Sequence, residues 1–206
     1  MTLDIITADA LDGVRHGFFG RAGGASSGVF AGLNCGYGSS DQDDVVVTAP
    51  RGLALSVLTA DCQPVLFADA QAGVIGAAHA GWKGALNGVL EATLDAMETL
   101  GAQRGRIAAV IGPSISQRAY EVGPEFFETF MDADPVYGRF FAQGEADRLQ
   151  FDLPGFGLHR LRTAGVGQAE WTRHCTYTDA GRFFSYRRSV HAREADFGRL
   201  ISAIRL

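Results

Sequence analysis

Short apolar runs separated by turn-forming residues dominate the first half of the chain and predict buried strands. The runs at residues 53–58 and 74–78 have strand length and are bounded by turn residues. Similar runs predict strands around residues 4–7, 14–19 and 107–111, and the alternation of residues 201–206 predicts a closing strand. A substantial sheet is therefore part of the predicted fold.

Helical periodicity appears in three later segments. Residues 84–100 predict one amphipathic helix that ends at Gly101. Its apolar positions recur at steps of three and four residues: Leu86, Val89, Leu90, Leu94, Met97 and Leu100. Pro124 suits the first turn of a second helix, residues 153–164 predict a third, and the polar, irregular residues 134–149 predict an exposed excursion. Strands outnumber the interspersed helices, so the class is mixed, α/β or α+β.

Composition narrows the classes of function. A chain of 206 residues with 47% hydrophobic content buries a sizeable core and predicts one domain. The net charge of −5 provides no basic surface for nucleic acid. No apolar run approaches bilayer length and the first residues lack a cationic signal-peptide start, so we expect a cytoplasmic protein that does not bind membranes. We also expect a monomer. Three widely spaced cysteines predict reduced thiols and no disulfide framework.

Reactive side chains concentrate in residues 58–83. Cys62 and His79 each follow a short apolar run, so two adjacent strands would present them side by side. A thiolate and an imidazole are zinc ligands, and they are equally a cysteine nucleophile and its base. A buried cysteine and a structural histidine are the plainer interpretation. The nearby Asp61, Gly81 and Trp82 favour a site, because small, aromatic and charged residues converge there at strand ends.

Two further segments are candidates for contact with a ligand. Residues 20–41 are rich in glycine and form either a surface loop or, with Arg21 among free backbone amides, a clamp for an anion. Residues 173–189 are dense in polar and aromatic groups. They indicate either a second wall of the site or a hydrogen-bonded pair of strands.

Several motifs, in this order, resemble those of the YfiH family, also called DUF152, laccase-domain or polyphenol-oxidase-like proteins. The motifs are HGFFGRAGGASSG, LTADCQPVLFAD, AAHAGWKG, IGPSISQRAYEVG and CTYTDAGRFFSYRR. The likeness extends over nearly the whole chain and includes the spacing between the cysteine and the histidine. It implies a single YfiH-like domain over residues 1–206 with an α+β fold, a layered α/β/β/α sandwich similar to the catalytic domain of cytotoxic necrotizing factors.

The resemblance also implies a metal site. In the family, the cysteine of the ADC motif and the histidine of the HAGW motif bind zinc, and they correspond to Cys62 and His79. The third family ligand, a histidine in a QVHG segment, has no counterpart here. The family inserts a helix, a strand and the QVHG turn between the pieces that meet near Val47 and Thr48, so we expect a segment to be missing there, deleted or omitted from this sequence.

The activity implied by the resemblance is that of a purine nucleoside phosphorylase and adenosine deaminase. The human relative FAMIN and bacterial members act on adenosine, inosine and methylthioadenosine, and Arg21 is our candidate for binding the phosphate. The alternative is a peptidoglycan-editing protein or a cysteine amidase that uses Cys62 and His79. We discount a copper polyphenol oxidase, because five histidines without an HxH pair are too few for a multicopper centre. No spacing selects a third zinc ligand among the remaining histidines, His16, His159, His174 and His191.

Overall fold

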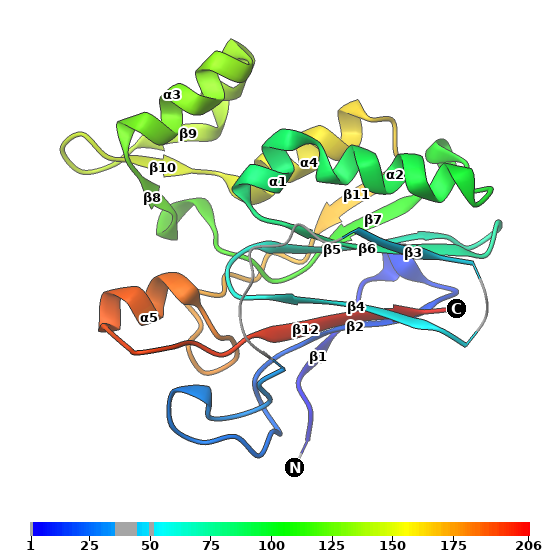
Figure 1. Cartoon of the computed structure of the whole chain (residues 1–206), viewed down its shortest axis with the longest axis horizontal. Helices are drawn as coiled ribbons and strands as arrows, with labels where there is room; N and C mark the ends of the chain where they lie inside the picture. The colour runs from blue at the N-terminus through cyan, green and yellow to red at the C-terminus, as the bar shows by residue number, and fades with distance from the viewer. Residues whose placement is uncertain (1, 36–44, 50–51) are drawn as a thin grey trace.

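Two β-sheets packed face to face form the body of the protein (Figure 1). The computed structural model describes residues 2–35, 45–49 and 52–206. The larger sheet has the strand order β11-β7-β5-β6-β3, with bounds Gln168–Trp171, Ala108–Ile111, Gln63–Asp69, Val74–Ala80 and Val45–Thr48. The smaller sheet has the order β1-β2-β12-β4, with bounds Ile5–Ile6, Arg15–Phe19, Leu200–Arg205 and Ala54–Thr59.

The central strand β5 is buried on both faces, which explains its continuous apolar sequence. Because side chains alternate along a strand, Val65 and Phe67 join the core beneath the helices, whereas Leu66 and Ala68 join the core between the sheets. The neighbouring strand β6 divides in the same way. Two separate cores, one on each face, therefore hold the larger sheet in the middle of the molecule.

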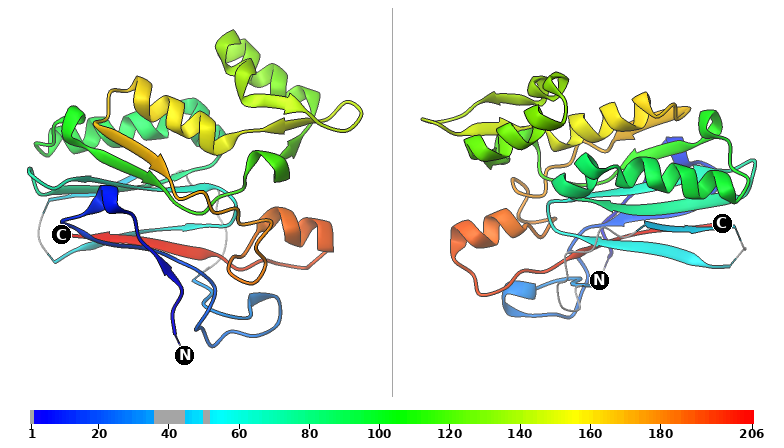
Figure 2. Two further views of the ribbon diagram at one scale, coloured as in Figure 1. Left: turned by 180° about the vertical axis from the view of Figure 1, so that it is seen from behind. Right: turned by 45° about the horizontal axis from the view of Figure 1, so that its top comes forward.

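Three helices cover the outer face of the larger sheet (Figure 2). They are α1 (Trp82–Asn87), α2 (Val89–Thr99) and α4 (Leu153–Thr163). The prediction of one helix over residues 84–100 was wrong in one respect, because Gly88 has a φ of 94° and divides it into α1 and α2. The predicted apolar stripe packs against the sheet, with Leu90, Leu94 and Met97 fully buried, but Leu100 lies beyond the helix and is 43% exposed.

A small lobe extends from one end of the sandwich. Its three strands, β8 (Glu121–Val122), β10 (Leu149–Phe151) and β9 (Phe141–Gln143), pack with α3 (Pro124–Ala133) around clustered aromatic rings. The expected exposed excursion at residues 134–149 is instead partly folded. Its apolar residues are the reason, since Phe140 is buried at the end of the 3-10 helix η5 (Pro135–Phe140) and Phe141 packs on Phe130.

The α+β class predicted from the sequence is confirmed, with helices, a five-stranded sheet and a four-stranded sheet in successive layers. The fifth helix, α5 (Tyr186–Ala192), lies at the end of the sandwich beside β12. Val47 and Thr48, where we expect a missing segment, lie within β3. Among the described residues, no helix is long and apolar enough to cross a membrane. The described residues also form four further 3-10 helices: η1 (Asp9–Leu11), η2 (Gly28–Phe30), η3 (Arg104–Arg106) and η4 (Gln117–Ala119).

A buried carboxylate holds the far end of β5. Asp69 is fully buried and accepts hydrogen bonds from the N–H of Ala72 (3.0 Å), the N–H of Gln103 (2.9 Å) and Nη2 of Arg106 (2.9 Å). Burial by itself raises the pKa of this carboxyl, but the donated hydrogen bonds and the Arg106 charge outweigh it and lower the pKa below 3.8. The charged form therefore stabilises the fold.

We expect Asp69→Asn to lower the free energy of unfolding by about 2 kcal/mol at neutral pH, because Arg106 loses its partner. A lowered folded-state pKa contributes stability above the unfolded-state pKa, and this is lost as the pH falls through the folded value. The difference between variant and wild type should therefore shrink in acid, as measured by urea denaturation. Asp147→Asn is the control, since Asp147 forms an exposed pair with Arg148 at 3.7 Å. Equal losses in the two variants would contradict the prediction.

Candidate functional site

Several strands bring their carboxyl ends to one edge of the sandwich. Strands β6 and β7 both run antiparallel to β5, and β11 runs parallel to β7, so these three strands end at the same edge. The connection from β4 to β5 passes through that edge as well. Loops that follow strand ends are where open α/β sheets bind their ligands. Residues distant in sequence therefore meet at this edge.

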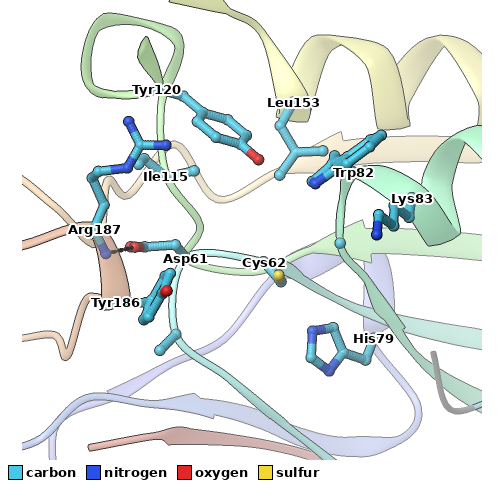
Figure 3. Close-up of a pocket in the computed structure, with 12 residues that line it drawn as sticks. Asp61, Cys62, His79, Trp82, Lys83, Ile115, Tyr120, Leu153, Tyr186 and Arg187 are labelled. Atoms are coloured by element: carbon cyan, nitrogen blue, oxygen red, sulfur yellow. Dashed lines mark hydrogen bonds between the residues drawn. The ribbon is translucent and has the colours of Figure 1, made fainter. Parts of the chain in front are cut away.

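A cavity of about 600 Å³ lies there. Figure 3 shows its lining side chains, which come from the loops after β4 and β7, from the end of β6, and from the first residues of α1, α4 and α5. The lining residues are Ala60, Asp61, Cys62, His79, Gly81, Trp82, Lys83, Ile115, Tyr120, Leu153, Tyr186 and Arg187. The cavity thus combines a thiol and an imidazole with aromatic and cationic groups.

Cys62 and His79 meet because β5 and β6 are paired. Gln63 lies opposite Ala80, so Cys62, one residue earlier, falls opposite Gly81. A Cβ atom on Gly81 would lie 3.1 Å from Cys62 Sγ, which shows how closely the thiol approaches the chain that follows β6. Both side chains are half-buried and face the same space in Figure 3. The two side chains thus face one space, as expected, although the runs at residues 53–58 and 74–78 are not the adjacent strands.

The strand that positions Cys62 differs from the one expected. The run at residues 53–58 forms β4, which belongs to the smaller sheet, whereas the run at 74–78 forms β6 in the larger sheet. The partner of β6 is β5, which begins directly after Cys62. This strand was not predicted from the sequence, because its short apolar run includes Pro64, a residue type that is rare inside a sheet.

Asp61 fixes the loop that carries Cys62. Its φ of 83° lies in the left-handed region, which is uncommon for a residue other than glycine. Its buried carboxylate accepts hydrogen bonds from Thr176 Oγ1 (2.6 Å), Ser185 Oγ (2.9 Å) and the backbone N–H of Arg187 (2.7 Å; Figure 3). The N–H of Ile115 donates to its carbonyl oxygen at 2.9 Å. Asp61 therefore joins the loops after β4, β7 and β11.

Aromatic rings form one wall of the cavity. The rings of Trp82 and Phe126 have centroids 4.6 Å apart, and the rings of Tyr120 and Phe126 have centroids 6.0 Å apart. Two cations complete this wall. The Lys83 ammonium lies 5.4 Å from the Trp82 ring, and the Arg187 guanidinium lies 5.3 Å from the Tyr120 ring. The wall thus offers flat apolar surfaces beside positive charge.

The segment at residues 173–189 contributes part of a wall and does not form a strand pair. After β11 it is largely loop, and then it enters α5 at Ser185, whose Oγ accepts a hydrogen bond from the N–H of Arg188 at 3.2 Å. The first residues of α5, Tyr186 and Arg187, line the cavity. Ser185 and Thr176 of the same segment bind the Asp61 carboxylate.

Arg21 is not brought to Cys62 and His79. Its guanidinium donates hydrogen bonds to the carbonyl oxygens of Ala31 (2.6 Å from Nη2) and Ala180 (3.2 Å from Nη1), and it lies 4.3 Å from the Phe184 ring. Burial and the Arg188 charge lower its pKa. The last part of this glycine-rich segment, residues 36–41, lies outside the described residues. The role of Arg21 in binding an anion stays a prediction.

The described residues do not complete a catalytic zinc site. Such a site takes three protein ligands, and Cys62 with His79 supplies two. Throughout residues 2–35, 45–49 and 52–206, no group of three or more histidine, cysteine, aspartate or glutamate side chains is placed to hold a metal ion. The other four histidines are all described, and none lines the cavity: His16, His159, His174 and His191.

Some residues that line the cavity were not predicted from the sequence. Lys83, Tyr120 and Leu153 are isolated examples of common residue types in segments that pattern analysis assigns to a loop or a helix. Tyr120 lies between a buried strand and a helix that begins with proline, a common place for ligand-binding loops, but its residue type does not distinguish it from neighbouring aromatic residues.

Comparisons with known proteins agree with this structure. A sequence model of the family described as multi-copper polyphenol oxidoreductase laccase matches residues 41–206. A purine nucleoside phosphorylase of Deinococcus radiodurans is 36% identical over 219 aligned positions, which cover 86% of this chain and 85% of that protein. The purine nucleoside phosphorylase YfiH of Escherichia coli is 39% identical over 150 residues, 73% of this chain and 60% of that protein.

A crystal structure shows the same likeness in three dimensions. A DUF152 protein of Neisseria meningitidis superimposes with a TM-score of 0.87 at 28% identity, covering 100% of this chain and 99% of that one. The resemblance found in the sequence motifs is thereby confirmed by both sequence and fold. The chain belongs to the YfiH family, whose sequence model is described as multi-copper polyphenol oxidoreductase laccase.

Proposed function

We propose that this protein is a purine nucleoside phosphorylase that cleaves adenosine, inosine or methylthioadenosine with inorganic phosphate. The observation that carries the proposal is the cavity itself, which places aromatic surfaces and two cations around Cys62 and His79. Relatives with more than a third of their aligned residues identical carry the name purine nucleoside phosphorylase. A purine is a flat ring and phosphate is an anion, so the two kinds of wall match the two substrates.

The chemistry joins three events at one carbon. A phosphate oxygen forms a bond to the ribose carbon that bears the base, the glycosidic bond breaks, and its electron pair leaves with the purine. We assign stacking of the base to Trp82, and binding of the phosphate to Lys83 and Arg187. Holding both substrates in line removes much of the entropic barrier to a two-substrate reaction.

We propose that Cys62 and His79 are two of the ligands of a zinc ion. We place the third ligand in the segment expected to be missing near Val47 and Thr48. The alignment with the Deinococcus radiodurans relative supports a gap, because its 219 positions exceed the 206 residues of this chain, so that relative has residues without counterpart here. Measuring bound zinc in this chain and in a version with the family segment restored tests the assignment.

The same two side chains favour a second class of reaction. Cys62 directly precedes β5, His79 lies in the neighbouring strand β6, and both face the same space, the arrangement that a cysteine nucleophile and its base require. We propose that the protein also deaminates adenosine. The alternative to both activities is a cysteine amidase of the peptidoglycan-editing type. Copper oxidase chemistry is disfavoured by the donor set, because His79 is the one histidine among the described lining residues.

An assay of the purified protein separates these functions. The protein is incubated with adenosine or inosine, with and without phosphate, and products are separated by chromatography. We expect free base and ribose 1-phosphate only when phosphate is present, and inosine from adenosine where deamination occurs. No product from any nucleoside, in protein supplied with zinc, would contradict the proposal.

Three arginine and lysine variants test how phosphate is bound. We expect Arg187→Gln and Lys83→Gln to raise KM for phosphate by about 10- to 100-fold, because each removes a charged donor worth about 1.5–3 kcal/mol. Arg21→Gln tests the remaining candidate: KM should stay nearly unchanged if the phosphate binds in the cavity, because Arg21 is not among the lining residues. Initial rates at varied phosphate concentration give these constants. A raised KM in Arg21→Gln, with KM unchanged in the other two variants, would indicate that Arg21 binds the phosphate.

A further inference from the structure

We propose that the hydroxyl of Tyr120 donates a hydrogen bond to the purine as the base leaves, so that it acts as a catalytic residue selective for bases that depart with negative charge. This inference rests on the proposed phosphorolysis. It concerns a residue that neither the sequence patterns nor the Cys62 and His79 pair pointed to.

The ring of Tyr120 is held in place from several sides. Phe126 and Phe151 contact it edge-on, with centroid distances of 6.0 and 5.9 Å and interplanar angles of 68° and 64°. The Arg187 guanidinium lies 5.3 Å from the same ring. Its backbone is fixed as well, because its N–H donates to Gln117 and its carbonyl accepts from the N–H of Phe151 (3.0 Å). The orientation of the hydroxyl is therefore set by packing.

The hydroxyl is left available by these contacts. In Figure 3 it points toward Leu153 and Trp82 and lies above Cys62, and all three of these residues line the cavity. Within the described part of the chain, no hydrogen bond to the hydroxyl oxygen of Tyr120 is formed. A polar group held in an aromatic setting without a protein partner is suited to a partner on the ligand.

The surroundings also keep the proton on this oxygen. Burial raises the pKa of Tyr120 well above its usual value of 10.0. A tyrosine that stays neutral is a hydrogen-bond donor throughout the working pH range. Its ionised form would instead repel a base leaving with negative charge.

The role follows from where charge appears in the reaction. When the glycosidic bond breaks, both of its electrons move into the purine, and negative charge spreads over the ring nitrogens and, in inosine, the oxygen. A fixed donor directed at that charge stabilises the transition state more than the ground state. Tyr120 retains its proton in this scheme, or shares it with the base, and no other reactant is needed.

The test compares two substrates in one variant. Tyr120→Phe keeps the ring and its packing and removes only the hydroxyl. We expect kcat for inosine to fall by about 100-fold, the effect of removing one such donor. With 7-methylinosine, whose base already carries a positive charge and leaves without a donor, kcat should change little. Tyr177→Phe is the matched control, because the Tyr177 hydroxyl pairs with His191 at 3.0 Å and does not line the cavity.

The outcomes distinguish a catalytic hydroxyl from a side chain that only shapes the cavity. A selective loss with inosine supports the proposal, provided that thermal unfolding shows the variant folded. Equal losses with both substrates would mean that Tyr120 only shapes the cavity, and no loss with inosine would mean that its hydroxyl contributes nothing; either result overturns the inference while leaving phosphorolysis in place. A wild-type protein inactive on both nucleosides would overturn the proposed function itself, and this inference with it.

Discussion

Replacing Cys62 with alanine is expected to reduce kcat/KM for nucleoside phosphorolysis by about 10³-fold or more. The thiol lies in the cavity beside the chain that follows β6. In the proposed function it acts together with His79, as a metal ligand or as a nucleophile and base. In either role the alanine variant removes the reactive sulfur, and losses of this size are typical of such residues. Product formation under initial-rate conditions measures the effect.

Two comparisons make this expectation specific. Cys35→Ala should retain wild-type activity, because Cys35 lies outside the cavity and burial raises the pKa of its thiol, which keeps it protonated and unreactive. The double variant Cys62→Ala with His79→Ala should be no worse than either single variant, since the two act as a unit. A Cys62→Ala protein that turns over as fast as wild type would remove this pair from the mechanism.

Metal analysis of the same proteins separates the two roles of the pair. Zinc bound by the wild type and lost from both single variants would assign Cys62 and His79 as ligands. Activity that survives complete metal removal, yet is abolished by alkylation of Cys62, would assign a nucleophile and its base.

The local chemistry of the site was predictable from the sequence, because it depends on features a few residues apart. Short apolar runs and the alternation of the last residues predicted half of the described strands, namely β1, β2, β4, β6, β7 and β12, and placed Cys62 and His79 near strand ends. The pairing of those strands was harder to predict. β5 is buried on both faces and carries no alternation, so its run gave no sign that it would be the partner of β6.

The far wall of the cavity could not be predicted from local sequence patterns, because it depends on contacts between residues distant in sequence. The side chains that bind the Asp61 carboxylate are 115 and 124 residues further along the chain, and only the packing of the sheet brings them together. Nothing in a window of a dozen residues distinguishes Tyr120 from the other aromatic residues of the lobe. Its exposure to the cavity follows from the position of β7 in the sheet order.

Asp61 lies next to Cys62 in sequence and binds the distant segment that forms the far wall of the cavity. We expect the loss of its carboxylate to lower both stability and phosphate binding. The carboxylate faces three donors from two hydroxyls and one backbone N–H, and it is 7% exposed. Asp61→Asn replaces one acceptor oxygen with an NH₂ group that turns a donor toward donors. Because asparagine tolerates a positive φ as well as aspartate does, the variant changes the carboxylate and leaves the backbone preference intact.

We therefore expect Asp61→Asn to lower the free energy of unfolding by about 3 kcal/mol, since hydrogen bonds to a buried charged group are lost and their donors stay buried. The same change frees the start of α5, so KM for phosphate should rise through displacement of Arg187. Urea denaturation and phosphate kinetics measure the two effects. Asp152→Asn is the control, because Asp152 accepts from the N–H of Gly155 at the start of α4 and asparagine caps helices equally well. Were Asp61→Asn as stable and as active as Asp152→Asn, the loops around the cavity would have to be held together by contacts other than the Asp61 carboxylate.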